Sequence, residues 1–277
     1  MKFGSFKIDG VETYGVESSN SVLPVSESFG QTYPNLLAAI SSEMTQEMEF
    51  KNSVLLRKVE FLPPIPNPKK IICAGLNYNK VYPIDVPIPV APGHPVVFTR
   101  FSDSFVGNGA ALHLPSGEAA NTYDYEGEIV AVIGKLMWRV SEGEAENYIF
   151  GYSIMNEGSV RGHQKHSIHA GKNFYRSGSW GPWIVPVSDA QAISDMRLET
   201  HVNGSLRQST YGNQMLFSLN RILSYLSHLY PLSPGDVIAT GSPEGSGGSL
   251  SPPNFLVSGD TVTVSVSSLG TLTNRVG

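Results

Sequence analysis

Two glutamates separated by one residue, Glu126 and Glu128, are the part of the sequence best suited to metal chemistry. In an extended strand, residues i and i+2 point to the same side of a sheet, so these carboxylates would lie roughly 7 Å apart at Cβ. They would repel each other unless a cation lies between them. Oxygen ligands of this kind suit a hard divalent ion such as Mg²⁺, Mn²⁺ or Ca²⁺. The alternative is an edge strand with two solvated glutamates, because Glu-x-Glu is a common triplet.

A second polar cluster, over residues 156–173, contains His163, His166 and His169. On a helix these positions would drift around the surface, and the cluster has no His-Glu-x-x-His motif, so a three-histidine zinc site is disfavoured. A single histidine is suited to general acid or base chemistry because its pKa is near neutral. The alternative is a polar surface loop.

The glycine-rich stretch at residues 244–249 does not predict nucleotide binding, because it lacks the Lys-Ser/Thr of a P-loop and does not open a helix. The sequence also lacks the Gly-x-Ser-x-Gly elbow of serine hydrolases. Its one cysteine, Cys73, excludes an internal disulfide and a cysteine-rich zinc site. We expect Cys73 to be buried, because it lies in an apolar run.

Charge and hydropathy exclude several classes of partner. The 19 basic and 24 acidic side chains give a net charge of −5, and no basic cluster extends beyond Lys69-Lys70. A nucleic-acid binder or a polybasic membrane anchor would need such a cluster. No apolar run approaches the ~20 residues of a membrane-spanning helix, and the first residues lack a signal-peptide core. We therefore expect a soluble, cytoplasmic protein without nucleic-acid or membrane partners.

The elements expected to position these groups are mostly strands. Only 16% of the 277 residues are charged, and there are 28 glycines and 19 prolines, which fits a turn-rich β or α+β protein. Alternating residues around Gly10 predict a hairpin. Apolar spacing predicts helices over 34–48 and 215–229, and Ser141-Glu142-Gly143-Glu144 matches a capping box for a helix to about Phe150. Strands are expected at 70–76, 96–100, 128–133, 152–156, 237–240 and 261–266.

A proline-rich connector divides the chain. Four prolines at 63–69 fix the backbone and remove hydrogen-bond donors, which predicts a stiff linker. We expect a small N-terminal α+β domain at residues 1–62 and a larger body at 70–277.

Ten short segments of this body occur in the order and spacing of a known family. They lie at residues 75–78, 97–100, 124–128, 151–156, 171–174, 181–183, 202–204, 234–238, 240–243 and 270–276. Over residues 70–276 the chain resembles the catalytic domain of the fumarylacetoacetate hydrolase superfamily. The resemblance implies a fold of mixed rolled β-sheets with few helices, a homodimer, and a divalent cation, Mg²⁺ before Mn²⁺ or Ca²⁺, in a central cleft.

The resemblance also implies a chemistry. Family members act on small 2-oxo acids and 1,3-dicarbonyl compounds, and a metal that grips two adjacent oxygens stabilises the enolate. Glu126 and Glu128 match two metal ligands, and Lys172 matches a lysine beside the substrate. Arg161, His163 and Gln164 are further catalytic candidates. Candidate substrate contacts are Tyr78, Val81, Thr240 and Ser242.

Two departures from the family pattern bear on function. The third metal ligand of the family is the aspartate of an Asn-Asp pair, whereas this chain has Asn156-Glu157. Glu157 keeps the charge but adds a methylene, which predicts a displaced ion and weaker affinity, most of all for Mg²⁺ with its strict octahedral geometry. Hydrolytic members also carry a histidine and a glutamate that activate water. Val81 and Ile84 stand in their places, and neither accepts a proton.

Three functional hypotheses follow. The first is a non-hydrolytic enzyme (tautomerase, isomerase, decarboxylase or cyclase) that keeps enolate stabilisation; apolar residues after Tyr78 suggest a substrate as large as a polyketide intermediate. The second is a C–C hydrolase with one of the three histidines as a substitute base. The third is a degenerate member that binds a ligand without turnover. Val81 and Ile84 favour the first over the second, because general-base assistance supplies roughly 10²–10⁴-fold in rate. Retention of Glu126, Glu128 and Lys172 disfavours the third.

Overall fold

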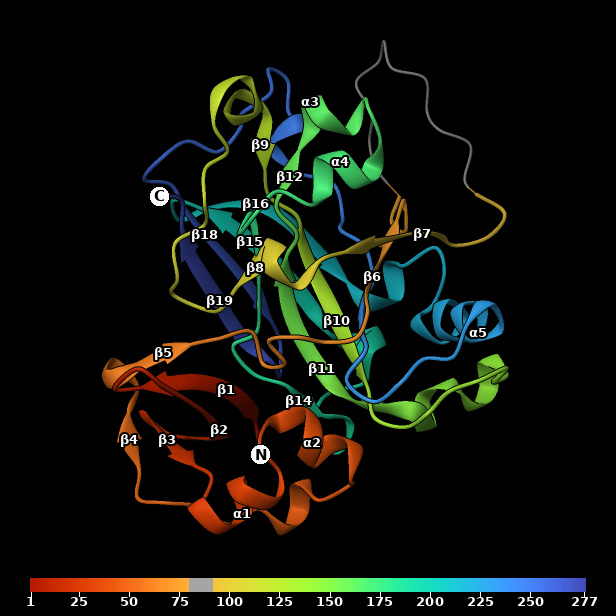
Figure 1. The fold of residues 1–277 in the computed structure, drawn as a ribbon. Coiled ribbons are helices and arrows are strands. Elements are labelled where there is room, and N and C mark those ends of the chain that lie inside the picture. The colour runs from red at the N-terminus through yellow and green to blue at the C-terminus, as the bar shows by residue number, and fades with distance from the viewer. Residues whose placement is uncertain (80–91) are drawn as a thin grey trace.

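The computed structural model describes residues 1–79 and 92–277, whose strands form four β-sheets with short helices around them (Figure 1). The largest sheet has eight strands and lies at the centre. Its order is β7 (Val96–Arg100), β6 (Ile71–Gly75), β17 (Val237–Ala239), β10 (Gly127–Ile133), β11 (Ile149–Asn156), β13 (Gly178–Trp180) and β8 (Phe105–Val106), and β14 (Val185–Pro186) pairs with β11.

The two long central strands, β10 and β11, are apolar because both faces of this sheet are covered. Residues 129–133 of β10 are fully buried. Ile129, Ala131 and Ile133 pack into one hydrophobic cluster, whereas Val130 and Val132 pack into another on the opposite face. Strand alternation therefore divides one apolar run between two cores.

The N-terminal region covers one of these faces (red and orange in Figure 1). The expected hairpin around Gly10 is confirmed: Asp9 and Gly10 both have positive φ, as a tight two-residue hairpin turn requires. Its five-stranded sheet has the order β4 (Val54–Leu55), β3 (Ser21–Pro24), β2 (Val11–Ser18), β1 (Phe3–Ile8) and β5 (Val59–Phe61), accompanied by α1 (Glu27–Thr32) and α2 (Leu36–Ser41).

The core of this region is continuous with the body. Phe3 and Leu36 share a hydrophobic cluster with Val130 of β10, and Phe3 also pairs with Ile184 through backbone hydrogen bonds. The division at residues 63–69 stays a prediction.

The opposite face of the central sheet is covered by a four-stranded sheet and the longest helix. Leu198, Val264 and Leu223 belong to the same cluster as Ile129. The sheet has the order β16 (Ser205–Tyr211), β15 (Arg197–Val202), β18 (Thr261–Val266) and β19 (Gly270–Arg275), and the helix is α5 (Leu219–Leu229).

Three expected helices differ in extent or type. The helix expected at 34–48 is wrong beyond residue 41, because Glu43 takes a left-handed conformation. The helix expected at 215–229 begins only at Leu219, because the backbone N–H groups of Leu216 and Phe217 bond to Asn77 instead. The segment after Ser141 is a 3₁₀-helix, Glu142–Tyr148, and the Ser141 hydroxyl donates to the Glu144 carboxylate rather than capping the backbone.

Short elements surround one end of the central sheet. Strands β9 (Tyr123–Asp124) and β12 (Ser159–Val160) pair with each other, and helices α3 (Arg161–Gln164) and α4 (Ile168–Lys172) follow β12 directly. Among the described residues, no helix combines the length and apolar character needed to cross a bilayer. The remaining short helices are 3₁₀ turns at Thr45–Glu47, Leu56–Lys58, Ser102–Ser104, Gly117–Thr122, Val187–Asp189, Ile193–Asp195, Gly212–Gln214 and Gly247–Ser249.

Candidate active site

Three glutamates meet where β10 begins and the antiparallel strand β11 ends. Carboxylate oxygens of Glu126, Glu128 and Glu157 lie within 4.8 Å of one another, and all three residues are buried. The strand register explains this, because Gly127 pairs with Asn156 and the Glu157 N–H donates to the Glu126 carbonyl at 2.7 Å. Glu128 follows two residues after Glu126. The edge-strand alternative is wrong, since β10 is central in its sheet and both glutamates are buried.

The Glu126 carboxylate receives direct contacts at both oxygens. Oε2 accepts hydrogen bonds from the Ser159 hydroxyl at 2.9 Å and from the Lys172 ammonium. Oε1 accepts from the Ser242 hydroxyl at 3.1 Å and lies 3.1 Å from the Arg161 guanidinium. This carboxylate is therefore fixed from several elements at once.

The Glu128 carboxylate is more deeply buried. Its Oε2 accepts the Gly241 backbone N–H at 2.9 Å. Gly241 has a φ of +96°, and a Cβ there would lie 2.9 Å from the Cβ of Asn77, so this turn requires glycine. Burial, followed by the charges of Glu157 and Glu126, raises the pKa of Glu128 well above its ordinary range.

Lys172 lies between the carboxylates. Its Nζ donates to Glu126 and, at 2.6 Å, to Glu157 Oε2, and it stands 5.4 Å from the centre of the Phe98 ring. Burial by itself would lower the pKa of Lys172, but the charges of Glu126 and Glu157 outweigh it and raise the pKa above its ordinary value. The lysine therefore stays cationic and offsets part of the carboxylate charge.

Arg161 and Asp124 connect the glutamates to the glycine-rich loop. Arg161 Nε donates to Asp124 Oδ2 at 2.7 Å, and the fully buried Asp124 also accepts backbone N–H groups of Gly247, at 2.7 Å, and Gly248, at 2.9 Å. This loop therefore directs its N–H groups to a side chain of the protein itself. Burial would lower the pKa of Arg161, but the Glu126 and Asp124 charges raise it.

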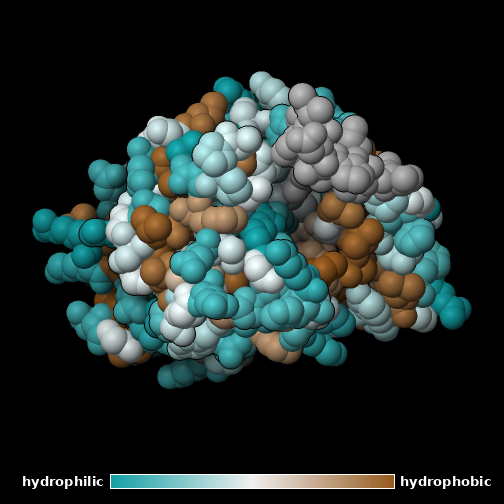
Figure 2. Space-filling model, turned by 90° about the horizontal axis from the view of Figure 1, so that it is seen from above, coloured by the Kyte–Doolittle hydropathy of each residue, from teal (hydrophilic) through white to brown (hydrophobic). Residues whose placement is uncertain are grey.

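The three glutamates, Lys172 and Arg161 line a pocket of about 300 Å³. Its lining combines charged and polar side chains with apolar ones. Figure 2 views the molecule from above and shows hydrophilic residues near the centre of this face, beside a hydrophobic group. The described lining residues are Ala74, Gly75, Leu76, Val96, Phe98, Glu126, Glu128, Glu157, Arg161, Gln164, Ile168, Lys172 and Ser242.

Comparison with known proteins identifies the family. The model of the fumarylacetoacetate (FAA) hydrolase C-terminal domain matches residues 70–277. The chain belongs to the fumarylacetoacetate hydrolase superfamily. Superfamily members are enzymes, among them tautomerases, isomerases and hydrolases. The expected fold of curled mixed sheets is confirmed.

Three relatives illustrate the range of this superfamily. The chain is 38% identical over 226 residues to oxaloacetate tautomerase YisK of Bacillus subtilis, covering 80% of this chain and 74% of that protein. It resembles the solved fumarylacetoacetate hydrolase of Exiguobacterium antarcticum with a TM-score of 0.85 and 32% identity, covering 100% and 99% of the two chains. The 5-carboxymethyl-2-hydroxymuconate delta-isomerase of Mycobacterium smegmatis gives a TM-score of 0.79 and 29% identity, with the same coverage.

The structure brings most of the expected superfamily site residues together. Lys172, Arg161, Gln164 and Ser242 line the pocket with the three glutamates. Their roles stay predictions. His163 is absent from the described lining residues; its ring contacts His166 and Phe174 instead.

Two further expected substrate contacts, Tyr78 and Thr240, are absent from the described residues that line this pocket. Thr240 is fully buried and its hydroxyl donates to the Ile129 carbonyl at 2.9 Å, inside the sheet. Tyr78 is also buried, and burial, with the nearby Glu128 charge, raises its pKa. Their assignment as substrate contacts stays a prediction. Val81, and with it Ile84, lies outside the described residues.

The donor set fits the divalent cation that superfamily enzymes commonly use. Three carboxylates converge, and Oε1 of the buried Glu157 has no hydrogen-bond partner within the described part of the chain. Buried carboxylate oxygens without a donor are costly unless a cation compensates them. All-oxygen ligation favours Mg²⁺, Mn²⁺ or Ca²⁺.

Sequence analysis did not single out two buried residues of this region, Asp124 and Arg100. Both occur within recognised family segments, but a charged residue at a strand end also fits a solvated surface position. Their significance comes from burial among distant segments, which no local spacing pattern reports.

Proposed function

We propose that this protein catalyses metal-assisted enolate chemistry, the keto–enol tautomerisation or isomerisation of a small 2-oxo acid or 1,3-dicarbonyl compound. The observation that carries the proposal is the convergence of three buried carboxylates and Lys172 on one pocket. Such a pocket can hold vicinal or 1,3-related oxygens while negative charge develops on them.

A non-hydrolytic reaction is favoured by the sequence. Val81 and Ile84 replace the water-activating pair of the hydrolytic pattern, and neither side chain can remove a proton from water. A tautomerisation moves a proton between carbon and oxygen and needs no attacking water. The names of the Bacillus and Mycobacterium relatives, a tautomerase and an isomerase, agree with this choice.

The pocket side chains would have different roles in this reaction. Lys172 supplies a positive charge, fixed by two carboxylates, that can face an enolate or carboxylate oxygen. Arg161 and Ser242 hold the Glu126 carboxylate in place. Leu76, Val96 and Phe98 also line the pocket, where their apolar side chains would exclude water from the rest of the substrate.

Glu126, Glu128 and Glu157 would hold the metal ion. When bound, a divalent ion supplies Lewis-acid stabilisation of the enolate oxygens. Thermal unfolding with EDTA, Mg²⁺, Mn²⁺ or Ca²⁺ tests this part separately, because a ligand at 100 times its Kd stabilises the native state by about 2.7 kcal/mol. The shift should vanish in Glu126→Ala.

Activity should be tested with enol-oxaloacetate and with an acylpyruvate in ¹⁸O-labelled water. We expect metal-dependent loss of the enol absorbance, no C–C cleavage of the acylpyruvate, and no ¹⁸O in a newly formed carboxylate; ¹⁸O in the keto group is not counted, because that oxygen exchanges with water without an enzyme. Rapid cleavage with ¹⁸O incorporation would contradict the proposal and favour a hydrolase with a substitute histidine base. The assay for hydrolysis is needed because the chain is 32% identical to a solved fumarylacetoacetate hydrolase. Each arm should be repeated with Lys172→Ala, which we expect to be inactive.

A further inference from the structure

A second buried arginine, Arg100, stands behind Glu157. It is the last residue of β7, and its side chain has no exposed surface. A guanidinium without contact to water needs hydrogen-bond acceptors and an opposite charge. The structure supplies both.

Three hydrogen bonds fix the orientation of this guanidinium. Nη1 donates to the Gly158 carbonyl at 3.1 Å, Nη2 to the Ser177 hydroxyl at 3.1 Å, and Nε to the Ser104 hydroxyl at 3.2 Å. The Phe105 ring lies beneath it, 4.2 Å from Cζ to the ring centroid. The planar group is therefore held at its edges and on one face, a geometry that lysine cannot reproduce.

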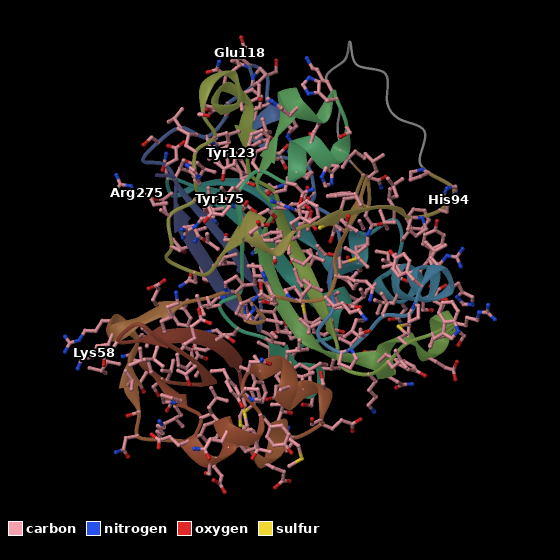
Figure 3. All side chains as sticks on the ribbon, viewed as in Figure 1. Lys58, His94, Glu118, Tyr123, Tyr175 and Arg275 are labelled. Atoms are coloured by element: carbon pink, nitrogen blue, oxygen red, sulfur yellow. The ribbon has the colours of Figure 1, made fainter. Side chains whose placement is uncertain are left out.

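These bonds join the two segments that carry Glu157 and Lys172. Gly158 follows Glu157 directly, and Ser177 lies in the segment after α4, the helix that ends at Lys172. The two segments are in close contact, since a Cβ at Gly158 would lie 1.6 Å from the Ser177 carbonyl oxygen. That oxygen accepts the hydroxyl of Tyr123, at 2.5 Å; Figure 3 labels Tyr123 in the upper part of the molecule.

The charge of Arg100 also faces Glu157. Nη1 lies 4.0 Å from Glu157 Oε1, the oxygen that has no hydrogen-bond partner in the described chain. At this separation the two charges attract without a direct hydrogen bond. Arg100 thus offsets part of the charge of the buried carboxylate without forming a hydrogen bond to Oε1.

We propose that Arg100 is a positioning residue that sets Glu157 for metal binding. It fixes the Glu157–Gly158 turn through the Gly158 carbonyl and neutralises Oε1 from a distance. Glu157 has one methylene more than the aspartate of the family pattern, so its carboxylate needs a fixed backbone and a fixed counter-charge to meet Glu126. This inference rests on the proposed metal site, but not on the identity of the substrate.

The test measures Mn²⁺ affinity by isothermal titration calorimetry, with thermal unfolding of each metal-free variant alongside. Removing a residue that orients a metal ligand typically weakens metal binding 10–100-fold, and we expect this range for Arg100→Met. Arg100→Lys keeps the positive charge but not the planar set of donors, so its Mn²⁺ affinity should lie between those of Arg100→Met and the wild type. Lys70→Met is the matched control, because Lys70 pairs with the buried Asp236 at 2.8 Å away from the pocket lining. It should lower stability and leave Mn²⁺ affinity unchanged.

A double-mutant cycle shows whether Arg100 acts through Glu157. In a Glu157→Gln background, Arg100→Met should change the Mn²⁺ Kd by less than about twofold, since coupled residues give non-additive effects. If Arg100→Met does not fold, Ser177→Ala, which removes one of the three bonds, should give a smaller weakening in the same direction.

Two results would overturn the inference: Mn²⁺ affinity in Arg100→Met equal to that of the wild type, or additivity of Arg100→Met with Glu157→Gln. Failure of the proposed function looks different. In that case the wild-type protein itself binds no Mn²⁺, or binds it without turning over any dicarbonyl substrate.

Discussion

The two sides of the glutamate cluster are held in different ways. On the Glu126 side, formed by Asp124, Glu126, Arg161 and Ser242, the carboxylate is contacted directly at both oxygens. On the Glu157 side, formed by Arg100, Glu157, Gly158 and Ser177, the backbone is fixed and one carboxylate oxygen has no donor among the described residues. The side with fewer direct bonds is the one where the sequence departs from the family pattern. A longer side chain can be accommodated there because Oε1 of Glu157 has no hydrogen-bond partner among the described residues, although Oε2 accepts the Lys172 ammonium at 2.6 Å.

Lys172 belongs to both sides, so its removal should have the largest effect. Lys172→Met leaves three buried carboxylates without their shared cation, and breaking a buried ion pair costs about 3–5 kcal/mol. We expect this loss in metal-free urea denaturation, partial recovery with Mg²⁺, and turnover reduced by at least ~100-fold, as for loss of an oxyanion donor. Lys165→Met, at an exposed position, is the control. Retained turnover would exclude the charge role of Lys172.

Asp124→Asn should disrupt the contacts on the Glu126 side and leave those on the Glu157 side intact. The substitution removes the charge opposite Arg161 and places an amide among the backbone donors of Gly247 and Gly248. We expect a loss of about 3 kcal/mol in unfolding free energy. The released Arg161 should also loosen Glu126, so Mn²⁺ affinity should fall with stability. A stability loss with unchanged affinity would show that the Glu126 side is held without Arg161.

The pH dependence of stability should sharpen the comparison, because Glu128 lies between the two sides. Its pKa in the native state is raised above the ordinary value of 4.5, so the native state binds the proton more tightly than the unfolded chain does. Metal-free stability should therefore fall as pH rises above about 4.5, by up to ~1.4 kcal/mol per pH unit, and level off above the native pKa.

If the site binds Mg²⁺ as proposed, the ion would favour the ionised carboxylate and oppose this decline, so the stabilising effect of Mg²⁺ should grow with pH. Urea denaturation in EDTA and in Mg²⁺ across this pH range measures both trends. Glu128→Gln should flatten the metal-free curve. A wild-type curve that rises with pH throughout would contradict the burial argument for Glu128.

The sequence predicted the parts of the site that depend on neighbouring residues better than the parts that depend on contacts between distant segments. The period-two spacing of Glu126 and Glu128 is local, and the apolar run after them correctly indicated a strand. Glu157 meets Glu126 only because β10 and β11 pair in one register, and sequence spacing within one strand does not specify that pairing. Lys172, Glu157 and Ser242 were expected near the site only through the family resemblance.

Other features depend on longer-range packing still. Arg100 and Asp124 could not be distinguished from surface charges, because their acceptors and donors come from segments up to 124 residues away. The predicted start of α5 at residue 215 was wrong for a similar reason. Asn77, which is distant in the sequence, accepts the backbone N–H groups of Leu216 and Phe217. Local pattern thus predicted the strands, whereas contacts between distant segments decided which charged side chains are buried.

The smallest expected effects come from removing one hydroxyl group on each side of the glutamate cluster. Ser242→Ala removes a 3.1 Å bond to Glu126 Oε1, but Arg161 still contacts the same oxygen, so Mn²⁺ affinity should change by less than about fivefold, equivalent to ~1 kcal/mol. Ser177→Ala removes a bond from Arg100, which is one of only three that hold that guanidinium among the described residues. We therefore expect the Ser177 variant to lose more affinity than the Ser242 variant, although Ser177 is more distant from the metal ligands. The opposite order in parallel Mn²⁺ titrations would mean that direct contacts, not the fixed backbone behind Glu157, set the affinity of the site.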